Sequence, residues 1–528
     1  MDGTPKQGPV RGLPPRALRF GARLAIAGAL LVALLFRIIA LGHVPGLNGD
    51  EAWYGVLAQQ IAAGGDPHWR TPTGNLPGPF QLGGLLILQT VFPPSFALLR
   101  IPSLLSSLAA AGLAWWIMRR YFGRDAGLIA LILAATLPIT IAYARFGWDP
   151  SHVPMIGLLC AGLALSGRRL ACALAFAVAI AAHPTNIFLG PFLLVLLFAG
   201  KVEGMGWRRA LGWAVPAALL LVLALGVLSL TTSGGQASTD PSRIAARLID
   251  PRQWAVFALL LGRLLSGDTV YAYISGAGFG AGHRLVDALT MLLLIAVVAA
   301  GLRSLLRRPF GKEAGIVAGW FASLLTFFLI AGPDALTPHL ERYAMCLIAP
   351  TLLAMTVLVR EIGGRQDRMP LAVVGTALAG LLLLAGFERH YLRAIDETGS
   401  LSHRAFWTGP VEPKEAALRA VLAGPHDRRL PIRLVAEDWW LYWPVAYLAS
   451  GKPVTVIDGS TLPAGALPPD LHWLVFAGGP LDRRLAVTPG AVPDQTISGT
   501  GRAALLRLWR TDTVSPAAPP RRDPPSGR

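Results

Sequence analysis

The stretch Phe80–Phe92, FQLGGLLILQTVF, decides how this chain is threaded through a membrane. It is an uncharged run of 13 residues, and a helix that crosses a bilayer needs roughly 17–25 residues. If the run crossed, every basic loop after it would move to the outer face. If it lies in the interface, those loops stay in the cytoplasm, as the positive-inside rule requires. We therefore predict that it does not span.

The composition around this run is that of a polytopic membrane protein. Of 528 residues, 53% are hydrophobic and 15% are charged, with a mean hydropathy of +0.52, whereas soluble chains carry about 25% charged residues. The net charge of +17 comes from short Lys and Arg clusters between apolar runs. This pattern indicates membrane orientation and argues against nucleic-acid binding. The three cysteines lie in apolar runs and offer neither a disulfide framework nor a zinc pattern.

The apolar runs predict a mainly α-helical membrane domain over residues 17–387, preceded by a basic cytoplasmic tail at 1–16. About eleven spans are expected, at 17–43, 97–118, 125–143, 151–166, 169–183, 185–200, 209–230, 285–303, 314–331, 342–360 and 369–387. Five basic turns between them fall on one side, which predicts a cytoplasmic N-terminus and an outer C-terminus. The outer loops 44–96 and 231–284 should each carry an interfacial helix, at 50–63 and 242–265.

From about residue 388 the sequence changes character. Strand patterns alternate with helix patterns, at 412–422, 432–436, 439–449, 454–457, 473–476 and 503–509. This alternation predicts a small α/β domain over 388–510 on the outer side of the membrane. The aromatic cluster Trp439–Trp443 favours packing between this domain and the membrane over a platform for a sugar. The Pro-, Arg- and Ser-rich residues 511–528 predict a disordered tail.

The predicted topology gathers ionisable side chains on the outer face. Asp50 and Glu51 follow the first span, and charges at such a place need a partner, water, a substrate or a metal. Asp149 joins them from a second outer loop, so that one carboxylate is a candidate general base for an acceptor hydroxyl. The candidate cations for a phosphate group are Arg70, Arg145, His183 and Arg342.

Each of these residues also has a structural interpretation that the sequence leaves open. Asp50 and Glu51 can cap the helix at 50–63, because acidic side chains are favourable at a helix N-terminus. Arg145 and Asp149 can form an ion pair at a helix end, and His183 before Pro184 can be a satisfied interfacial histidine. Glu341–Arg342 can anchor the start of a span at the interface.

Four pieces of the sequence together resemble the GT-C superfamily of membrane glycosyltransferases. They are similar to motifs of the bacterial relatives of protein O-mannosyltransferases and aminoarabinose transferases, a glycosyltransferase family 39-like branch. The pieces are Asn48–Tyr54 (NGDEAWY), Arg100–Leu104 (RIPSL), Tyr143–Ser151 (YARFGWDPS), and Glu341–Tyr343 leading to Ala349–Pro350. The resemblance covers roughly residues 20–200 and 335–390. The chain departs from the aminoarabinose transferases at Pro77–Pro79 (PGP), where they carry Lys-Pro-Pro, which argues against their mode of donor recognition.

The resemblance implies an inverting transfer from a polyprenyl-phosphate sugar to a hydroxyl of a glycolipid or other envelope acceptor. The reaction would take place in the lipid bilayer, at the outer face of a bacterial inner membrane. Asp50 would be the catalytic base, with Glu51 and Asp149 as further catalytic candidates. The implied donor phosphate ligands are Arg70, Arg145, His183 and Arg342. The sequence indicates no particular cofactor, and it leaves open a divalent metal held by Asp50, Glu51 and Asp149.

Three other functions compete with this one. A protein O-glycosyltransferase would keep the fold and change the acceptor. A lipid or sugar transporter or flippase predicts inverted repeats and broken helices in matching positions, and the sequence shows no such symmetry. A structural or scaffold protein of the membrane is the third alternative.

Overall fold

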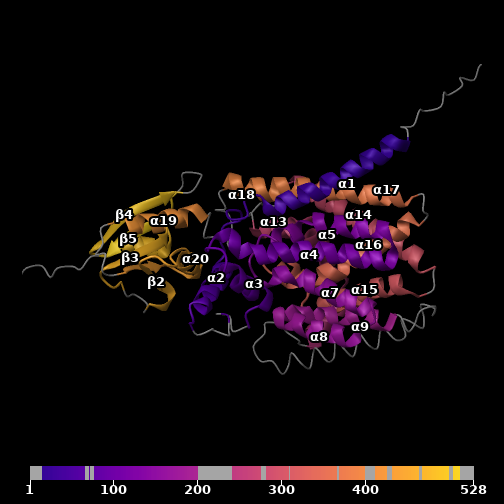
Figure 1. The fold of residues 1–528 in the computed structure, drawn as a ribbon, viewed down its shortest axis with the longest axis horizontal. Helices are drawn as coiled ribbons and strands as arrows, with labels where there is room; N and C mark the ends of the chain where they lie inside the picture. The colour runs from indigo at the N-terminus through magenta and orange to yellow at the C-terminus, as the bar shows by residue number, and fades with distance from the viewer. Residues whose placement is uncertain are drawn as a thin grey trace, which may run out of the picture.

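The computed structural model describes residues 15–65, 71, 76–199, 241–274, 281–307, 310–364, 368–398, 411–424, 431–462, 467–498 and 504–511. A large helical part carries a small sheet domain at one end (Figure 1). The predicted span 209–230, Arg70 and the tails at 1–14 and 512–528 lie outside the described residues.

The first half of the chain forms helices of very different length. They are α1 (Pro15–Ile38), α2 (Gly49–Ala62), α3 (Pro79–Gln89), α4 (Phe96–Phe122), α5 (Arg124–Thr136), α6 (Pro138–Tyr143), η1 (Asp149–His152), α7 (Val153–Leu165), α8 (Arg169–Ala182), η2 (Pro184–Leu189) and α9 (Gly190–Ala199). The second half continues the bundle. Its helices are α11 (Pro241–Ile249), α12 (Pro251–Ser266), α13 (Asp268–Ile274), α14 (Ala281–Leu305), α15 (Lys312–Ile330), η3 (Pro333–Leu336), η4 (Glu341–Leu347), α16 (Ile348–Gly363), α17 (Met369–Phe387), η5 (Glu388–Leu392) and α18 (Arg393–Thr398).

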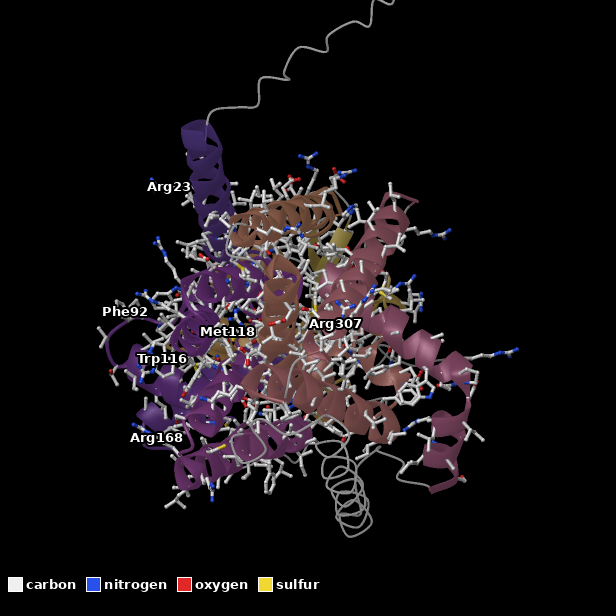
Figure 2. All side chains as sticks on the ribbon, turned by 90° about the vertical axis from the view of Figure 1, so that its right-hand side faces the viewer. Arg23, Phe92, Trp116, Met118, Arg168 and Arg307 are labelled. Atoms are coloured by element: carbon white, nitrogen blue, oxygen red, sulfur yellow. The ribbon has the colours of Figure 1, made fainter. Side chains whose placement is uncertain are left out.

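The predicted number of eleven spans is not confirmed. Within the described ranges, five helical segments are long and apolar enough to cross a membrane, and a sixth is gained if α12 and α13, bent by 72°, count as one. Several predicted spans are shorter apolar helices, such as α7, α8 and α9. Figure 2 views the helical part from the end away from the sheet domain, where Arg168 and Arg307 of two basic turns are labelled. The side of the membrane on which each end lies stays a prediction.

The run that decides the topology forms α3, which has 11 residues. At 1.5 Å per residue it is about 16 Å long, about half of the roughly 30 Å of a hydrocarbon core. Pro79 begins the helix, and Gln81, Leu82 and Leu85 are buried. The prediction of a helix too short to span is confirmed.

The predicted single helix over 242–265 is wrong, because the segment forms two helices, α11 and α12. Pro251 lacks an N–H and is suited to a first helical position. The side chain of Asp250 accepts a hydrogen bond from the N–H of Arg252, at 2.9 Å, and so caps the new helix. Gly267, with φ of +93°, ends α12 in the left-handed region that favours glycine.

The sheet domain has five strands in the order β2-β1-β3-β5-β4. Strands β1 (Ile432–Ala436), β2 (Val454–Asp458) and β3 (Leu471–Phe476) are parallel, whereas β4 (Ala491–Ser498) and β5 (Ala504–Thr511) pair antiparallel. The helices of this domain are α19 (Val411–Ala423), α20 (Trp439–Leu448) and α21 (Pro480–Leu485). The predicted alternation is confirmed, but the sequence analysis missed β4. This edge strand is mostly exposed and contains Pro493, so it lacks the pattern of a strand with one buried face.

Helix α20 joins the sheet domain to the helical part. Its Tyr447 is buried in one apolar cluster with residues of α2, α3 and α4, and its hydroxyl donates a hydrogen bond to the carbonyl of Ser95 at 3.2 Å. A Cβ atom at Gly55 of α2 would lie 2.5 Å from the Tyr447 ring and 2.7 Å from a methyl group of Leu99. The sequence predicted that the Trp439–Trp443 cluster packs between this domain and the membrane; in the structure, Trp443 packs against helices of the helical part, and contact with the membrane stays a prediction.

This close approach predicts a stability loss for Gly55→Ala. Overpacking a closely packed contact costs about 1–3 kcal/mol, so the variant should unfold at a lower temperature than the parent in detergent. Gly83→Ala on α3 is the matched control, because no atom lies within 4 Å of its Cβ position. Equal unfolding temperatures for the two variants would contradict the docking geometry.

Candidate active site

A cavity of about 220 Å³ lies between the helical part and the sheet domain. Its lining residues are Asp50, Trp53, Tyr54, Thr71, Leu76, Trp148, Asp149, Pro150, Ala182, His183, Pro184, Arg342, Tyr343 and Trp439. Four of the site residues predicted from the sequence thus meet here, namely Asp50, Asp149, His183 and Arg342. Glu51 and Arg145 do not line the cavity.

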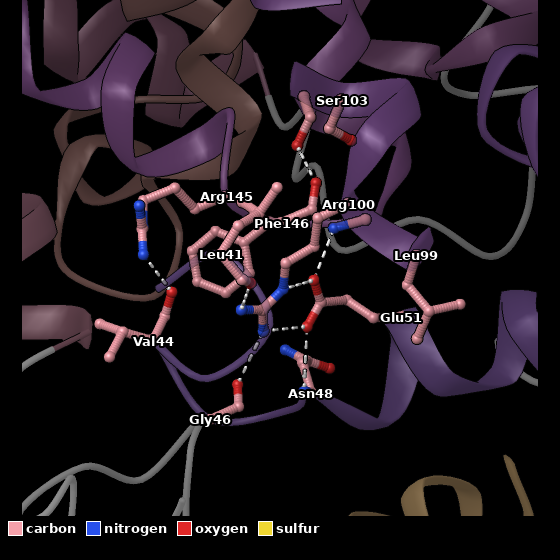
Figure 3. A network of polar contacts seen from close by, with 12 residues as sticks. Leu41, Val44, Gly46, Asn48, Glu51, Leu99, Arg100, Ser103, Arg145 and Phe146 are labelled. Carbon is pink, nitrogen blue, oxygen red and sulfur yellow. Dashed lines mark hydrogen bonds and ion pairs between the residues drawn. The ribbon is translucent and has the colours of Figure 1, made fainter. Parts of the chain in front are cut away.

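Glu51 is fully buried in a network behind the cavity, shown in Figure 3. Arg100 donates from Nε to Oε1 at 3.0 Å and from Nη2 to Oε2 at 3.1 Å. The backbone N–H of Gly147 donates to Oε1 at 2.6 Å, and that of Asn48 donates to Oε2 at 3.1 Å. Asn48 and Glu51 form a capping box at the start of α2. The helix-cap interpretation is confirmed for Glu51, whose two carboxylate oxygens are occupied by these donors.

Arg145 is buried against the C-terminal end of α1. Its guanidinium donates to the carbonyls of Phe36, Ile39, Ala40 and Val44, at 2.6 to 3.3 Å. The last carbonyls of a helix have no partner within the helix, and Arg145 satisfies them. The structure therefore gives Arg145 a role in ending the first helix, away from the cavity. It forms no ion pair with Asp149 in the described part of the chain.

Asp149 is held in the cavity wall by Tyr54 and Gly78. The Tyr54 hydroxyl donates to Oδ2 at 2.5 Å and accepts from the N–H of Gly78 at 2.8 Å. The other oxygen, Oδ1, is buried and has no hydrogen-bond partner among the residues that the structure describes. A Cβ atom at residue 78 would lie 1.9 Å from this oxygen, so only glycine fits there. Sequence analysis singled out neither Tyr54 nor Gly78, although both lie in stretches that it quoted.

The environment of Asp149 favours its protonated form. Burial raises the pKa of this carboxyl to about 7, against the lowering effect of the Tyr54 hydrogen bond, while the charge of Asp50 raises it slightly further. Asp50, in the first turn of α2, is partly exposed to the cavity. Burial also raises the pKa of Asp50, and the positive charge of Arg342 counteracts that rise. Two carboxylates with raised pKa values therefore share one wall.

Arg342 supplies the positive charge of the cavity. Its guanidinium lies over the rings of Trp148 and Tyr343, at 5.7 and 5.2 Å from their centres, an arrangement favourable to a cation. Its neighbour Glu341 is buried and accepts a hydrogen bond from the Tyr143 hydroxyl at 3.1 Å, so it faces the bundle. The two adjacent residues therefore point to different surroundings.

His183 lies at the turn between α8 and η2 and borders the cavity. Its Nδ1 lies 2.7 Å from the hydroxyl of Thr185. Burial and the charge of Arg342 lower the pKa of His183 to about 4. At neutral pH it is therefore a neutral hydrogen-bonding group and does not act as the cation that the sequence predicted.

The three carboxylates predicted as candidate metal ligands do not assemble. Asp50 and Asp149 share the cavity, but both oxygens of Glu51 are held by Arg100 and backbone N–H groups. In the part of the chain that the structure describes, no three His, Cys, Asp or Glu side chains are placed to hold a metal ion. Arg70, the remaining predicted phosphate ligand, lies outside the described residues.

Glu51 and Asp50 should differ sharply in their effect on stability. Breaking a buried ion pair costs about 3–5 kcal/mol because it leaves an uncompensated charge, so Glu51→Gln should unfold at a much lower temperature. Asp50→Asn should be as stable as the parent, since burial already disfavours the charged form of Asp50. Thermal unfolding followed by tryptophan fluorescence measures both, and equal stability of the two variants would refute the assignment.

No family model matches the sequence, and no curated protein matches it. Among solved structures, the chain is similar to ArnT from Cupriavidus metallidurans bound to undecaprenyl phosphate, at 15% identity. The match covers 95% of this chain and 99% of that one, with a TM-score of 0.50. A second match is the Archaeoglobus fulgidus oligosaccharyltransferase in complex with Zn and sulfate, at 15% identity, 80% and 61% coverage, and a TM-score of 0.42.

The architecture is that of a polytopic helical membrane protein, with a cavity lined by charged and aromatic side chains beneath a small α/β domain. The likeness to ArnT over nearly the whole of both chains then defines the fold. The chain has the GT-C fold, as its sequence motifs predicted.

Proposed function

We propose that this chain is an inverting glycosyltransferase that moves a sugar from a polyprenyl-phosphate donor to a hydroxyl of an envelope acceptor. The observation that carries the proposal is the cavity that unites Asp50, Asp149 and Arg342 within a GT-C fold. ArnT, which matches along its whole length, is bound to undecaprenyl phosphate in its structure. A polyprenyl donor also fits a chain that is itself largely embedded in lipid.

The cavity contains an acidic residue, Asp50, that suits the acceptor hydroxyl and a basic residue, Arg342, that suits the phosphate leaving group. The acceptor oxygen would bond to the anomeric carbon while the bond from that carbon to the phosphate oxygen breaks. Asp50 would take the acceptor proton, and the polyprenyl phosphate would leave with the electron pair. Arg342 would stabilise the charge that grows on the phosphate, and groups aimed at developing charge contribute strongly to catalysis.

We assign Asp149 to the donor sugar. Asp149 lines the cavity, and the Tyr54 hydroxyl that donates to its Oδ2 fixes the position of the carboxyl group there. The neutral His183 would donate to a phosphate or sugar oxygen. Neither Glu51 nor Arg145 has a part in this scheme, because their polar groups serve the fold.

The proposal includes the sidedness that the basic turns predict. The N-terminus would lie in the cytoplasm of a bacterial cell, and the cavity and the α/β domain at about 388–510 would lie at the outer face of the inner membrane. The same geometry also accommodates a protein hydroxyl as acceptor, and the assay below compares both acceptor classes.

Asp50→Asn tests the proposal directly. A positioned general base contributes about 10²- to 10⁴-fold to a rate, so the variant should lose at least about 10²-fold of transfer while staying folded. The assay uses proteoliposomes, labelled undecaprenyl-phosphate sugars, and extracted envelope glycolipids or proteins as acceptors. Parental transfer rates in Asp50→Asn would contradict the role of Asp50. A parent protein that transfers no sugar from any donor would overturn the proposed function.

The pH dependence of kcat/KM should reveal the ionisation of Asp149 and its dependence on the hydrogen bond from Tyr54. The Tyr54 hydroxyl donates to the carboxylate and so holds its pKa down. Tyr54→Phe removes that donor, so the pKa of Asp149 rises above about 7 and the ionised fraction at neutral pH falls. If transfer requires the carboxylate, the rising limb of kcat/KM moves to higher pH in this variant. A rising limb that stays at the parental pH in Tyr54→Phe would contradict the coupling between Tyr54 and Asp149.

A further inference from the structure

We propose that Trp439 of the sheet domain forms the acceptor-side wall of the cavity and selects a hydroxyl carried on a sugar ring. This inference rests on the proposed function and deepens it by naming the acceptor class. Among the described residues that line the cavity, Trp439 is the one contributed by the sheet domain, and the others come from the helical part. The sheet domain thereby completes the cavity.

Residues of both the helical part and the sheet domain fix the position of Trp439. A Cβ atom at Gly49 would lie 2.4 Å from the indole Nε1 and 3.1 Å from the Trp439 carbonyl oxygen, so the indole needs glycine at that position. Gly49 directly precedes Asp50, which places the indole beside the proposed base. Asp438 caps α20 by accepting from the N–H of Trp440, at 2.9 Å, and fixes the turn that presents Trp439.

A second contact, with Trp443, also fixes the indole ring of Trp439. Its ring meets the ring of Trp443 edge to face, with 5.5 Å between the ring centres and 70° between the planes. Trp443 packs against the cluster of α2, α3 and α4 that also anchors Tyr447. Trp439 is itself only partly buried, so one part of the ring remains available to the cavity.

The position of Trp439 assigns it to the acceptor. The donor would enter from the bilayer, with its phosphate at Arg342 of the helical part, whereas Trp439 reaches the cavity from the domain outside that part. A substrate that arrives from the outer side therefore meets Trp439 and Asp50 together. Asp50 is also the group proposed to take the proton of the acceptor hydroxyl.

The chemistry of the indole favours a sugar ring over a peptide side chain. An aromatic face offers a flat apolar surface for the C–H face of a sugar, and the indole N–H donates a hydrogen bond to a hydroxyl or ring oxygen. The other aromatic residues of the lining are Trp53, Tyr54, Trp148 and Tyr343. A serine or threonine side chain presents no such face and would gain little from this wall.

The test compares Trp439→Ala, Trp439→Phe and the control Trp440→Ala in the reconstituted full-length protein. The donor is the undecaprenyl-phosphate sugar that the parent uses, and the acceptor probes are octyl glucoside and a serine-containing peptide amide. Trp440 is a matched control because it lies next to Trp439 on α20 and does not line the cavity. Thermal unfolding of each variant checks that the domain remains docked.

Loss of an aromatic contact corresponds to about a tenfold change in affinity. We expect Trp439→Ala to raise KM for the glucoside about tenfold with little change in kcat. Trp439→Phe should recover most of the affinity, and Trp440→Ala should match the parent. An unchanged KM in Trp439→Ala, or equal losses in the two alanine variants, would overturn the inference.

The acceptor class is decided by the parent protein. Efficient transfer to the peptide amide and none to the glucoside would overturn the sugar-ring assignment even if Trp439 affects KM. Failure of the proposed function would look different. In that case the parent would transfer no sugar from any donor to either acceptor, and Asp50→Asn would show the same lack of transfer.

Discussion

The geometry of the cavity depends on the buried ion pair between Glu51 and Arg100. Arg100 lies in α4 and also donates to the carbonyls of Leu41 and Gly46, so one guanidinium holds the end of the first helical segment and the start of α2. Glu51 in turn accepts from the N–H of Gly147, two residues before Asp149. The pair thereby fixes the two chain segments that carry Asp50 and Asp149. A buried pair of this kind is tolerated because every charged oxygen has a donor.

Asp50 and Glu51 show how adjacent carboxylates acquire different roles. Successive residues of a helix are turned by about 100° around its axis, so Glu51 faces α4 while Asp50 faces the cavity. The capping box uses Glu51 and leaves Asp50 without a structural duty at the helix start. Gly49 and Gly55 on the same helix lack side chains where α20 packs closely. One short helix thus provides the proposed base, the buried anchor and the docking surface for the sheet domain.

The sequence was sufficient to predict that Asp50 and Asp149 meet, because that question depends on topology, but it did not show that Glu51 faces away from them. The short run at 80–92 kept Asp50 and Asp149 on one face, and α3 is indeed too short to cross. The sequence could not separate Arg145 from Arg342, since both are arginines in outer segments near acidic residues. Only the fold shows that Arg145 meets the free carbonyls at the end of α1, whereas Arg342 lies over two aromatic rings beside the cavity. The close fits of Gly78 to Asp149 and of Gly49 to Trp439 are contacts between distant segments, and no local pattern encodes them.

In the proposed reaction, a donor phosphate at Arg342 would change the charge around Asp50. Arg342 lowers the pKa of Asp50, against the effect of burial, so the unliganded site holds Asp50 as a weaker base. A donor phosphate bound at Arg342 would compensate that positive charge, and the pKa of Asp50 would rise. A more basic Asp50 beside a bound donor would favour proton transfer from the acceptor hydroxyl. Asp50 and Trp439 line the same cavity. The proposed base and the side chain proposed to hold the acceptor therefore face the same substrate.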